Sequence, residues 1–235
     1  PIHSLKNTKL LTLSPPSSIS NASDPLLSHP HPVSRTQSLR ALVINFQSLR
    51  PKKQELWNLL ESTDPDIILG TETWLRPDIT NCELFPPTYD VYRRDRHDAH
   101  GGVLVATKRT LITHQVPSDP SAEAVLVSIQ SHNKSSNVIV GSLYRPPSAV
   151  SPELTASMTR VMEVACRSQK DVVWLGGDLN LPDINWKTGA VEGNQYPKAM
   201  NQAYLDKFHD LGLCVIDHAL GGVTLRIDQK VVSQH

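Results

Sequence analysis

The sequence contains little cysteine, no net charge and no long apolar run, and each shortage argues against a class of protein. Three widely spaced cysteines, Cys82, Cys166 and Cys214, form neither a disulfide framework nor a metal or redox motif. We interpret them as buried or incidental thiols in a reducing compartment. The 23 basic residues balance 23 acidic ones, so no global basic field draws the chain to nucleic acid. No apolar run approaches membrane-spanning length, and no signal peptide is visible.

Residues 1–38 differ in composition from the rest of the chain. They contain six prolines, nine serines, no glycine and a single acidic residue, Asp24. Such a stretch cannot bury enough apolar surface to offset the entropy of ordering it. We therefore predict a disordered linker over 1–38 and a folded domain over 39–235. Because the chain begins at Pro1 rather than methionine, we expect a fragment from which an upstream targeting segment could have been lost.

From residue 39 onward, strand-like and helix-like segments alternate. Strands are expected over 41–45, 66–72, 89–93, 102–107, 124–130, 136–145 and 171–176, and helices over 51–60, from Ser151 onward, and over 198–211. Strands in pairs, then singly between helices, predict an α/β protein in which two packed mixed sheets are flanked by helices.

The segment from Asp171 to Asn180 is an apolar strand that ends in two glycines, a carboxylate and a carboxamide. On extended backbone Asp178 and Asn180 point the same way, roughly 6–7 Å apart along the chain. Asp178 can then ligate a hard cation or orient a nucleophilic water, and Asn180 can hold a substrate oxygen. A strand followed by an Asp/Asn turn explains these residues alone equally well.

Three other apolar strands also end in groups that can bind metal or phosphate. One ends at Asn45, one at Glu72, and one at Tyr144 and Arg145. Ligands gather at strand ends in sheet proteins, so these groups predict one shared pocket. Its predicted members are Asn45, Glu72, Tyr144, Arg145, Asp178 and Asn180.

Four motifs in this order resemble the endonuclease domain of non-LTR retrotransposons. They are Asn45-Phe46-Gln47-Ser48-Leu49, Thr71-Glu72-Thr73-Trp74-Leu75, Leu143-Tyr144-Arg145-Pro146-Pro147, and Gly177-Asp178-Leu179-Asn180-Leu181-Pro182-Asp183-Ile184-Asn185-Trp186. That domain belongs to the exonuclease, endonuclease and phosphatase superfamily, with deoxyribonuclease I and the apurinic endonucleases. The similarity runs from about Arg40 to Leu213 and implies a four-layer α/β sandwich.

The resemblance implies a role for each predicted site residue. Glu72 matches the ligand of a Mg²⁺ ion, for which Mn²⁺ can substitute, and Asn45 lies beside it. Tyr144 would hydrogen-bond the phosphate, with Arg145 alongside to bind substrate. Asp178 matches the aspartate that orients the attacking water, and Asn180 matches the family's asparagine.

The implied activity is nicking of DNA, which leaves a 3′-hydroxyl that primes reverse transcription. The implied partners are DNA and a downstream reverse transcriptase domain that this fragment lacks, and the implied location is nuclear. The Arg145-Pro146-Pro147 motif favours this activity over the superfamily's phosphatases of inositol lipids or sphingomyelin.

The C-terminus departs from the family pattern. A closing Ser-Asp-His segment is absent, since Ser233-Gln234-His235 has glutamine at the aspartate position. We therefore expect a truncated or frameshifted copy with impaired catalysis, or alternatively an inactive domain or weak nucleic-acid binder. Residues 214–235, with charges crowded between Arg226 and Lys230, are expected to pack poorly at a surface or sheet edge.

Two further segments imitate functional sites. Asp217-His218 follows a short apolar run, and we interpret it as a solvated turn rather than the missing pair. The loop from Arg93 to Gly102 contains His97, His100, Asp95 and Asp98. Without cysteine or helical histidine spacing it predicts a polar hairpin connection rather than zinc, although its arginines can meet a nucleic-acid backbone.

Overall fold

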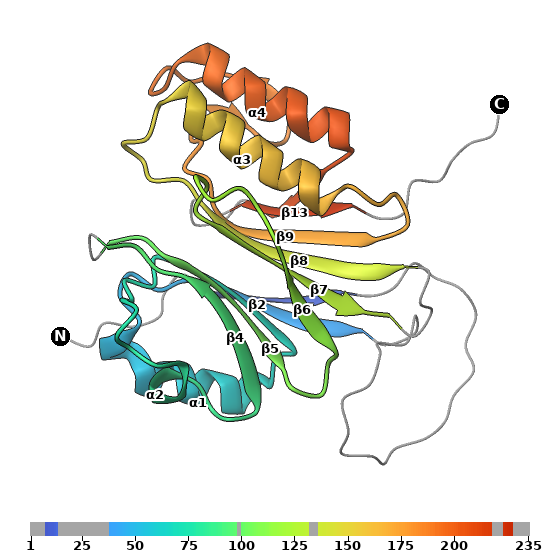
Figure 1. Cartoon of the computed structure of the whole chain (residues 1–235). Helices are drawn as coiled ribbons and strands as arrows, with labels where there is room; N and C mark the ends of the chain where they lie inside the picture. The colour runs from blue at the N-terminus through green and yellow to red at the C-terminus, as the bar shows by residue number, and fades with distance from the viewer. Residues whose placement is uncertain (1–7, 14–37, 98–99, 132–135, 218–222, 228–235) are drawn as a thin grey trace.

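The structure, a computed structural model, is a four-layer sandwich of two β-sheets with helices on both outer faces (Figure 1). It describes residues 8–13, 38–97, 100–131, 136–217 and 223–227. The helices α1 (Lys53–Thr63) and α2 (Asn81–Leu84) cover one sheet, and α3 (Pro152–Ala165) and α4 (Lys198–Leu211) cover the other. The predicted architecture of two packed mixed sheets flanked by helices is therefore confirmed.

The first sheet has the strand order β1-β2-β3-β5-β4. Its strands are β1 (Thr8–Leu13), β2 (Leu39–Asn45), β3 (Ile67–Thr71), β4 (Tyr89–Arg94) and β5 (Val103–Lys108). Only the pair of β2 and β3 is parallel among these described strands. Every residue of β3 is buried, as an apolar run in the centre of a covered sheet requires.

The second sheet has the strand order β12-β13-β9-β8-β7-β6. Its strands are β6 (Thr113–Val116), β7 (Ala124–Gln130), β8 (Asn137–Tyr144), β9 (Val172–Asp178), β12 (Cys214–Asp217) and β13 (Val223–Ile227). The pair of β8 and β9 is parallel. A separate two-stranded ribbon joins β10 (Ile184–Asn185) to β11 (Ala190–Val191).

Local sequence signals explain where the long helices begin and end. The side chain of Ser151 accepts a hydrogen bond from the backbone nitrogen of Leu154 at 3.1 Å, and Pro152 follows at the first helical position of α3. The helix α4 ends at Leu211 and is capped by Gly212, which adopts a left-handed φ of 67°. A short 3₁₀ turn, η1 (Arg50–Lys52), precedes α1, so this helix begins at Lys53 rather than at Pro51 as expected.

Three apolar clusters form the core, one between the sheets and one beneath each helical layer. The cluster between the sheets includes Leu69 of the first sheet and Trp174 of the second, which are both buried. No helix among the described residues is long and apolar enough to cross a membrane.

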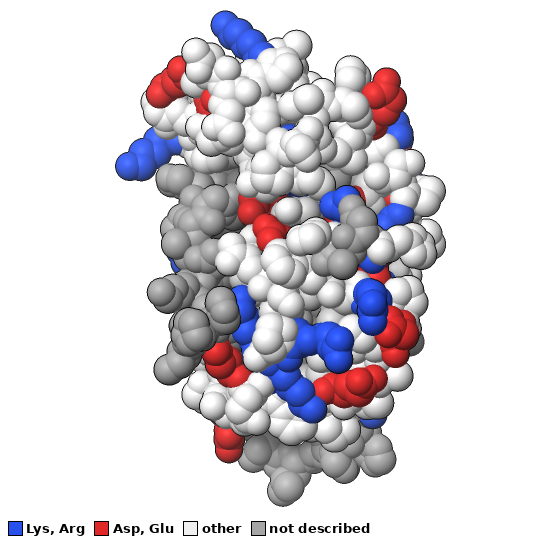
Figure 2. Space-filling model, turned by 90° about the vertical axis from the view of Figure 1, so that its left-hand side faces the viewer, with Lys and Arg blue, Asp and Glu red and all other residues white. Residues whose placement is uncertain are grey.

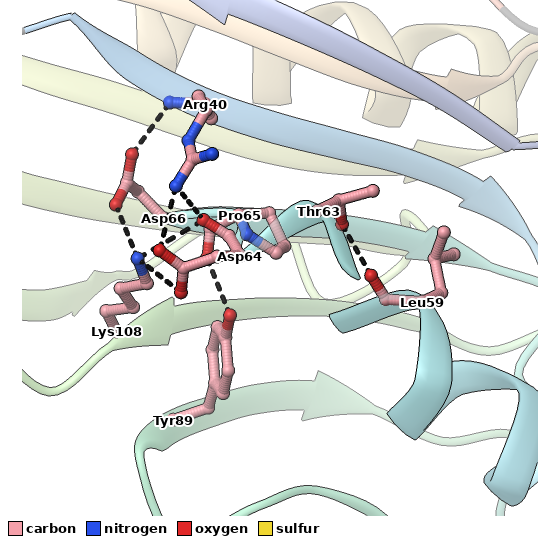
Figure 3. A network of polar contacts seen from close by, with 8 residues as sticks. All are labelled: Arg40, Leu59, Thr63, Asp64, Pro65, Asp66, Tyr89 and Lys108. Atoms are coloured by element: carbon pink, nitrogen blue, oxygen red, sulfur yellow. Dashed lines mark hydrogen bonds and ion pairs between the residues drawn. The ribbon is translucent and has the colours of Figure 1, made fainter. Parts of the chain in front are cut away.

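An ion-pair network fastens the first sheet at the end where β2 and β3 begin (Figure 3). Lys108 at the end of β5 lies 2.9 Å from Asp64 and 3.1 Å from Asp66. Arg40 contacts Asp64 at 2.8 Å, and the Tyr89 hydroxyl donates to the carbonyl of Pro65 at 2.6 Å. The candidate site lies at the opposite end of these strands, so this network takes no part in it.

The structure corrects the expectation of a linker over 1–38 for residues 8–13. These residues form β1, which pairs antiparallel with β2 from Thr8 opposite Ile44 to Leu13 opposite Leu39. The segment Thr8-Lys9-Leu10-Leu11-Thr12-Leu13 contains three leucines and no proline, so it can complete a sheet edge. Residues 1–7 and 14–37 lie outside the described residues.

The expectation that the tail over 214–235 lies at a surface or sheet edge is wrong for residues 223–227, although β12 does lie at the edge of the sheet. The strand β13 occupies an inner position between β9 and β12, paired from Val223 opposite Gly177 to Ile227 opposite Val173. The sequence Val223-Thr224-Leu225-Arg226-Ile227 alternates with the period of a strand, which the emphasis on its charges overlooked. Residues 218–222 and 228–235 lie outside the described part of the chain.

Candidate active site

Two parallel strand pairs bring the predicted site residues to one edge of the sandwich. Asn45 ends β2 opposite Thr71, the last residue of β3, and Glu72 follows directly. In the second sheet, Tyr144 at the end of β8 lies opposite Asp178 at the end of β9. The carboxyl ends of parallel strands are where α/β sheets form ligand sites.

The side chain of Asn45 connects the carboxylates of the two sheets. Its Nδ2 donates to Glu72 Oε1 at 3.2 Å and to Asp178 Oδ2 at 3.3 Å. Its Oδ1 is buried and accepts no hydrogen bond from the described residues. A buried acceptor without a partner costs free energy, so its retention at this position points to a ligand.

The charges of Tyr144, Glu72 and Asp178 are coupled because these groups share one partly buried region. Burial, with a smaller contribution from the charge of Glu72, raises the pKa of Asp178 to about 6, although hydrogen bonds from the Asn180 backbone and Asn45 oppose the rise. Burial also raises the pKa of Tyr144, and the charges of Glu72 and Asp178 add to this effect. The site therefore holds excess negative charge that a cation would relieve.

The loops that carry these groups adopt left-handed backbone conformations. Glu72 has a φ of 50°, Gln47 of 44° and Ser48 of 77°. The two loops are joined by backbone hydrogen bonds, including one from Ser48 N to Glu72 O at 3.0 Å. Such conformations are unfavourable for residues with side chains and persist where the surroundings hold them, often at functional sites.

Lys52 is a buried basic residue of this edge that the sequence did not reveal. Its Nζ donates to the carbonyl of Gln47 at 3.0 Å and to that of Phe46. Burial lowers the pKa of Lys52, and the charges of Glu55 and Glu72 oppose this shift. The ammonium therefore holds the loop beside Glu72. Within the run Pro51-Lys52-Lys53, no sequence signal distinguishes this lysine from a solvated one.

Arg145 does not reach a substrate position, in contrast to the expectation that it binds substrate. It is 0% exposed. Its guanidinium donates to the carbonyls of Leu179 at 2.7 Å, of Ala149 at 2.5 Å, and of Asn180. The Asn180 side chain donates in return to the Arg145 carbonyl at 2.8 Å. Arg145 and Asn180 thus tie the loop after β8 to the loop after β9.

Asp183 supports Arg145 indirectly, by holding the loop that carries Tyr196. The sequence did not reveal this role. Its carboxylate accepts from the backbone nitrogens of Gln195 at 2.8 Å and Tyr196 at 2.6 Å. The ring of Tyr196 then lies 4.5 Å from the guanidinium of Arg145, within cation–π distance. In the sequence, Asp183 appears only as one residue of the motif that ends at Trp186. Its backbone partners come from a later loop, so the sequence did not reveal its role.

The loop between β4 and β5 is a hairpin connection, as predicted. Asp95 pairs with Arg93 at 3.0 Å, and the ring of His100 lies 4.7 Å from that of Trp74. Among the described residues, no group of three or more His, Cys, Asp or Glu could hold a metal. Asp98 and His218 lie outside the described residues, and Asp217 ends β12.

The donor set nevertheless fits a divalent cation. Two carboxylates and one carboxamide oxygen are hard ligands of the kind that Mg²⁺ accepts, with water completing the shell. The unpartnered Oδ1 of Asn45 and the raised pKa of Asp178 both suit such an ion. Figure 2 shows this edge of the sandwich, with acidic atoms in its middle and basic groups gathered toward the first sheet.

A model of the Endonuclease/Exonuclease/phosphatase family matches residues 42–227. The chain therefore belongs to the endonuclease/exonuclease/phosphatase family. No curated protein matches the chain.

Several solved structures share the fold. The endonuclease domain of TRAS1, a telomere-specific non-LTR retrotransposon, is 17% identical over 80% of this chain and 83% of that chain, with a TM-score of 0.58. The 3′-5′ exonuclease NExo from Neisseria meningitidis is 16% identical over 78% and 85%, with a TM-score of 0.56. The AP endonuclease LMAP from Leishmania major is 14% identical over 76% and 68%, with a TM-score of 0.58. These likenesses confirm the deoxyribonuclease I-like fold.

Proposed function

We propose that this chain is a Mg²⁺-dependent phosphodiester hydrolase that nicks DNA, as the endonuclease domain of a non-LTR retrotransposon. The observation that carries the proposal is the bridge from Asn45 to both Glu72 and Asp178. It joins two sheets through oxygen-rich groups at the edge where ligands bind. The structural likeness to nucleases supports a nucleic-acid substrate over a lipid one.

Each group then has a chemical task. Glu72 and Asn45 would hold the divalent ion, with Mn²⁺ able to substitute, and this ion supplies charge neutralisation at the phosphate. Asp178 would orient the attacking water, and the Tyr144 hydroxyl would donate to a phosphate oxygen. Asn180 and Arg145 would position these groups through the loops they join.

The sequence also supports weak turnover. The resemblance implies a closing Ser-Asp-His segment that residues 214–235 do not contain in recognisable form, and loss of a group that contacts the phosphate commonly costs a factor of about 10² to 10⁴ in rate. The alternative function is therefore an inactive domain that keeps only weak affinity for nucleic acid. A reverse transcriptase domain beyond this chain and a nuclear location belong to the same proposal.

Nicking of supercoiled plasmid tests the proposal directly. Slow nicking that needs Mg²⁺ and disappears in Glu72→Gln would support hydrolysis, because this change removes one ligand charge without changing size. Glu61→Gln, on the exposed face of α1, is the matched control and should nick like the unchanged protein. If the only nicking observed is a background that needs no metal and is the same in Glu72→Gln, the alternative of an inactive domain is supported.

Binding of Mn²⁺, followed by electron paramagnetic resonance of the free ion, separates the ion site from turnover. We expect weak binding that falls at least tenfold in Glu72→Gln, even where nicking is near background. Equal binding by Glu72→Gln and Glu61→Gln would contradict the assignment of Glu72 as a ligand.

A further inference from the structure

A cavity of about 490 Å³ adjoins the candidate site. It forms where the end of β4, the turn before β7 and the loop between β8 and α3 meet. Its walls are residues 94–97, residues 121–123, and Pro146, Ala149 and Leu154. The volume lies in the range of small-ligand pockets.

The cavity shares a wall with the phosphate-binding side of the site. The backbone nitrogen of Tyr144 donates to the Glu123 carbonyl at 2.9 Å, and the Glu123 charge contributes to the raised pKa of Tyr144. The guanidinium of Arg145 donates to the carbonyl of Ala149, another residue of the wall. A strand whose reacting phosphate lies at Tyr144 would therefore continue past this cavity.

Each acidic group of the cavity has an arginine partner. Asp95 Oδ2 lies 3.0 Å from the guanidinium of Arg93. Glu123 Oε2 lies 3.6 Å from that of Arg96, and the Glu123 carboxylate also accepts from the backbone nitrogen of Gly102. These pairs offset the negative charge inside the cavity.

Arg94 supplies the excess positive charge. Its guanidinium donates to the backbone carbonyls of Asp119 and Pro120, which orient it without neutralising it. The lining of the cavity also includes the apolar residues Ala122 and Leu154. A lining that combines a positive charge with apolar residues suits a ligand with one phosphate and a flat organic ring.

We propose that the cavity binds one unpaired nucleotide of the DNA strand, next to the phosphate held at Tyr144. The inference rests on the proposed function, because it takes the substrate to be DNA. The phosphate of this nucleotide contacts Arg94, and its sugar and base lie against the apolar residues of the lining. A base stacked in a duplex cannot enter such a pocket, so the protein should prefer DNA that is unpaired there.

Fluorescence anisotropy in EDTA measures this preference without hydrolysis. Two labelled duplexes of equal length are compared, one fully paired and one with a central bubble. We expect about tenfold tighter binding of the bubble duplex, which corresponds to about 1.4 kcal/mol. Arg94→Gln should weaken bubble binding about tenfold and reduce its salt slope by about one. Ala149→Phe, which fills the cavity, should abolish the preference while retaining binding of paired DNA.

Arg109→Gln is the matched charge control, since Arg109 is exposed, lies just beyond the far end of β5 and pairs with Asp90 at 2.9 Å. It should keep the preference, as should Arg94→Lys. Equal binding of both duplexes, or equal effects of Arg94→Gln and Arg109→Gln, would overturn the proposal. Should Arg94→Gln fail to fold by circular dichroism, Ala149→Phe decides alone. If the protein prefers bubble DNA but shows no Mg²⁺-dependent nicking, the proposed nucleotide pocket stands and only the proposed hydrolysis is contradicted.

Discussion

Asp178 illustrates how a site residue can weaken the protein that carries it. Asp178 is only 8% exposed, and its carboxylate lies near the charge of Glu72. Hydrogen bonds from the Asn180 backbone and the Asn45 side chain offset this cost only in part, since the pKa remains raised to about 6. Functional sites commonly retain such unfavourable groups because activity requires them.

We expect Asp178→Asn to stabilise the metal-free protein at neutral pH. A pKa raised from 3.8 to about 6 means that the folded state binds the proton more tightly than the unfolded state. This contribution is full below about pH 4 and is lost as the pH rises to about 6. At about 1.4 kcal/mol per pH unit, ionised Asp178 costs on the order of 3 kcal/mol at pH 7.5.

Urea unfolding in EDTA at pH 4.5 and 7.5 measures the effect as a difference between the two proteins. The variant should gain stability over the unchanged protein at pH 7.5 and much less at pH 4.5. The same difference at both values would contradict a raised pKa. Other acids titrate in both proteins and cancel in the comparison.

At the scale of elements, the fold depends on how loops are tied to strand ends. Arg145 is the main connection between the loop after β8 and the loop after β9, with several carbonyl acceptors and the ring of Tyr196 around one guanidinium. A buried charge with this many partners leaves unsatisfied carbonyls when it is removed.

Arg145→Ala should therefore destabilise the protein by about 3–5 kcal/mol, the usual cost of breaking a buried charged network. Arg109→Ala, at an exposed arginine with one ion pair, should change stability by no more than about 0.5 kcal/mol. Midpoints of urea unfolding compare the two. If Arg145→Ala unfolds like Arg109→Ala, the guanidinium is not the connection proposed here.

Elements with strong local signals were predictable from the sequence, whereas pairing partners were not. The bounds of β7 and α4 agree with those expected, because alternation, apolar faces and a terminal glycine define them locally. The strand β1 was missed, because its six residues become a strand only through pairing with β2. The inner place of β13 likewise depends on β9, which is far away in sequence.

The same division holds within the site. Asn45, Glu72, Tyr144 and Asp178 were predictable as neighbours, because parallel strands end at one edge. The inward turn of Arg145 was not, because burial of an arginine depends on carbonyls supplied by other loops.

At the scale of the whole molecule, the site exists only because the two sheets approach closely. Gly176 of β9 faces Leu69 of β3, and a Cβ atom at Gly176 would lie 2.8 Å from Leu69 Cδ1. Ser142 of β8 also donates to the Gly70 carbonyl at 2.8 Å across the same interface. The hydrogen bond between Asn45 and Asp178 spans these sheets, so their separation controls it.

Gly176→Ala should push the sheets apart at the site. Overpacking of this kind costs about 1–3 kcal/mol, and Mn²⁺ affinity should fall as Asp178 moves from Asn45. Gly189→Ala provides the comparison, because no atom lies within 4 Å of a Cβ there, although its φ of 67° adds local strain. A loss of stability without loss of Mn²⁺ affinity in Gly176→Ala would show that the ion site tolerates sheet movement.

The C-terminal strands should be required for this closed sandwich. In a chain that ends at Leu213, the side of β9 that pairs with β13 would be open, from Val173 to Gly177. An exposed edge on a buried apolar strand recruits other chains, so we expect aggregation in size-exclusion chromatography and a lower thermal midpoint. A chain that ends at Ile227 keeps β12 and β13 and should remain closer to the full chain in both measurements. If the chain ending at Leu213 is monomeric and as stable as the full chain, the pairing of β13 with β9 contributes little, and the weakly packed tail expected from the crowded charges is the better description.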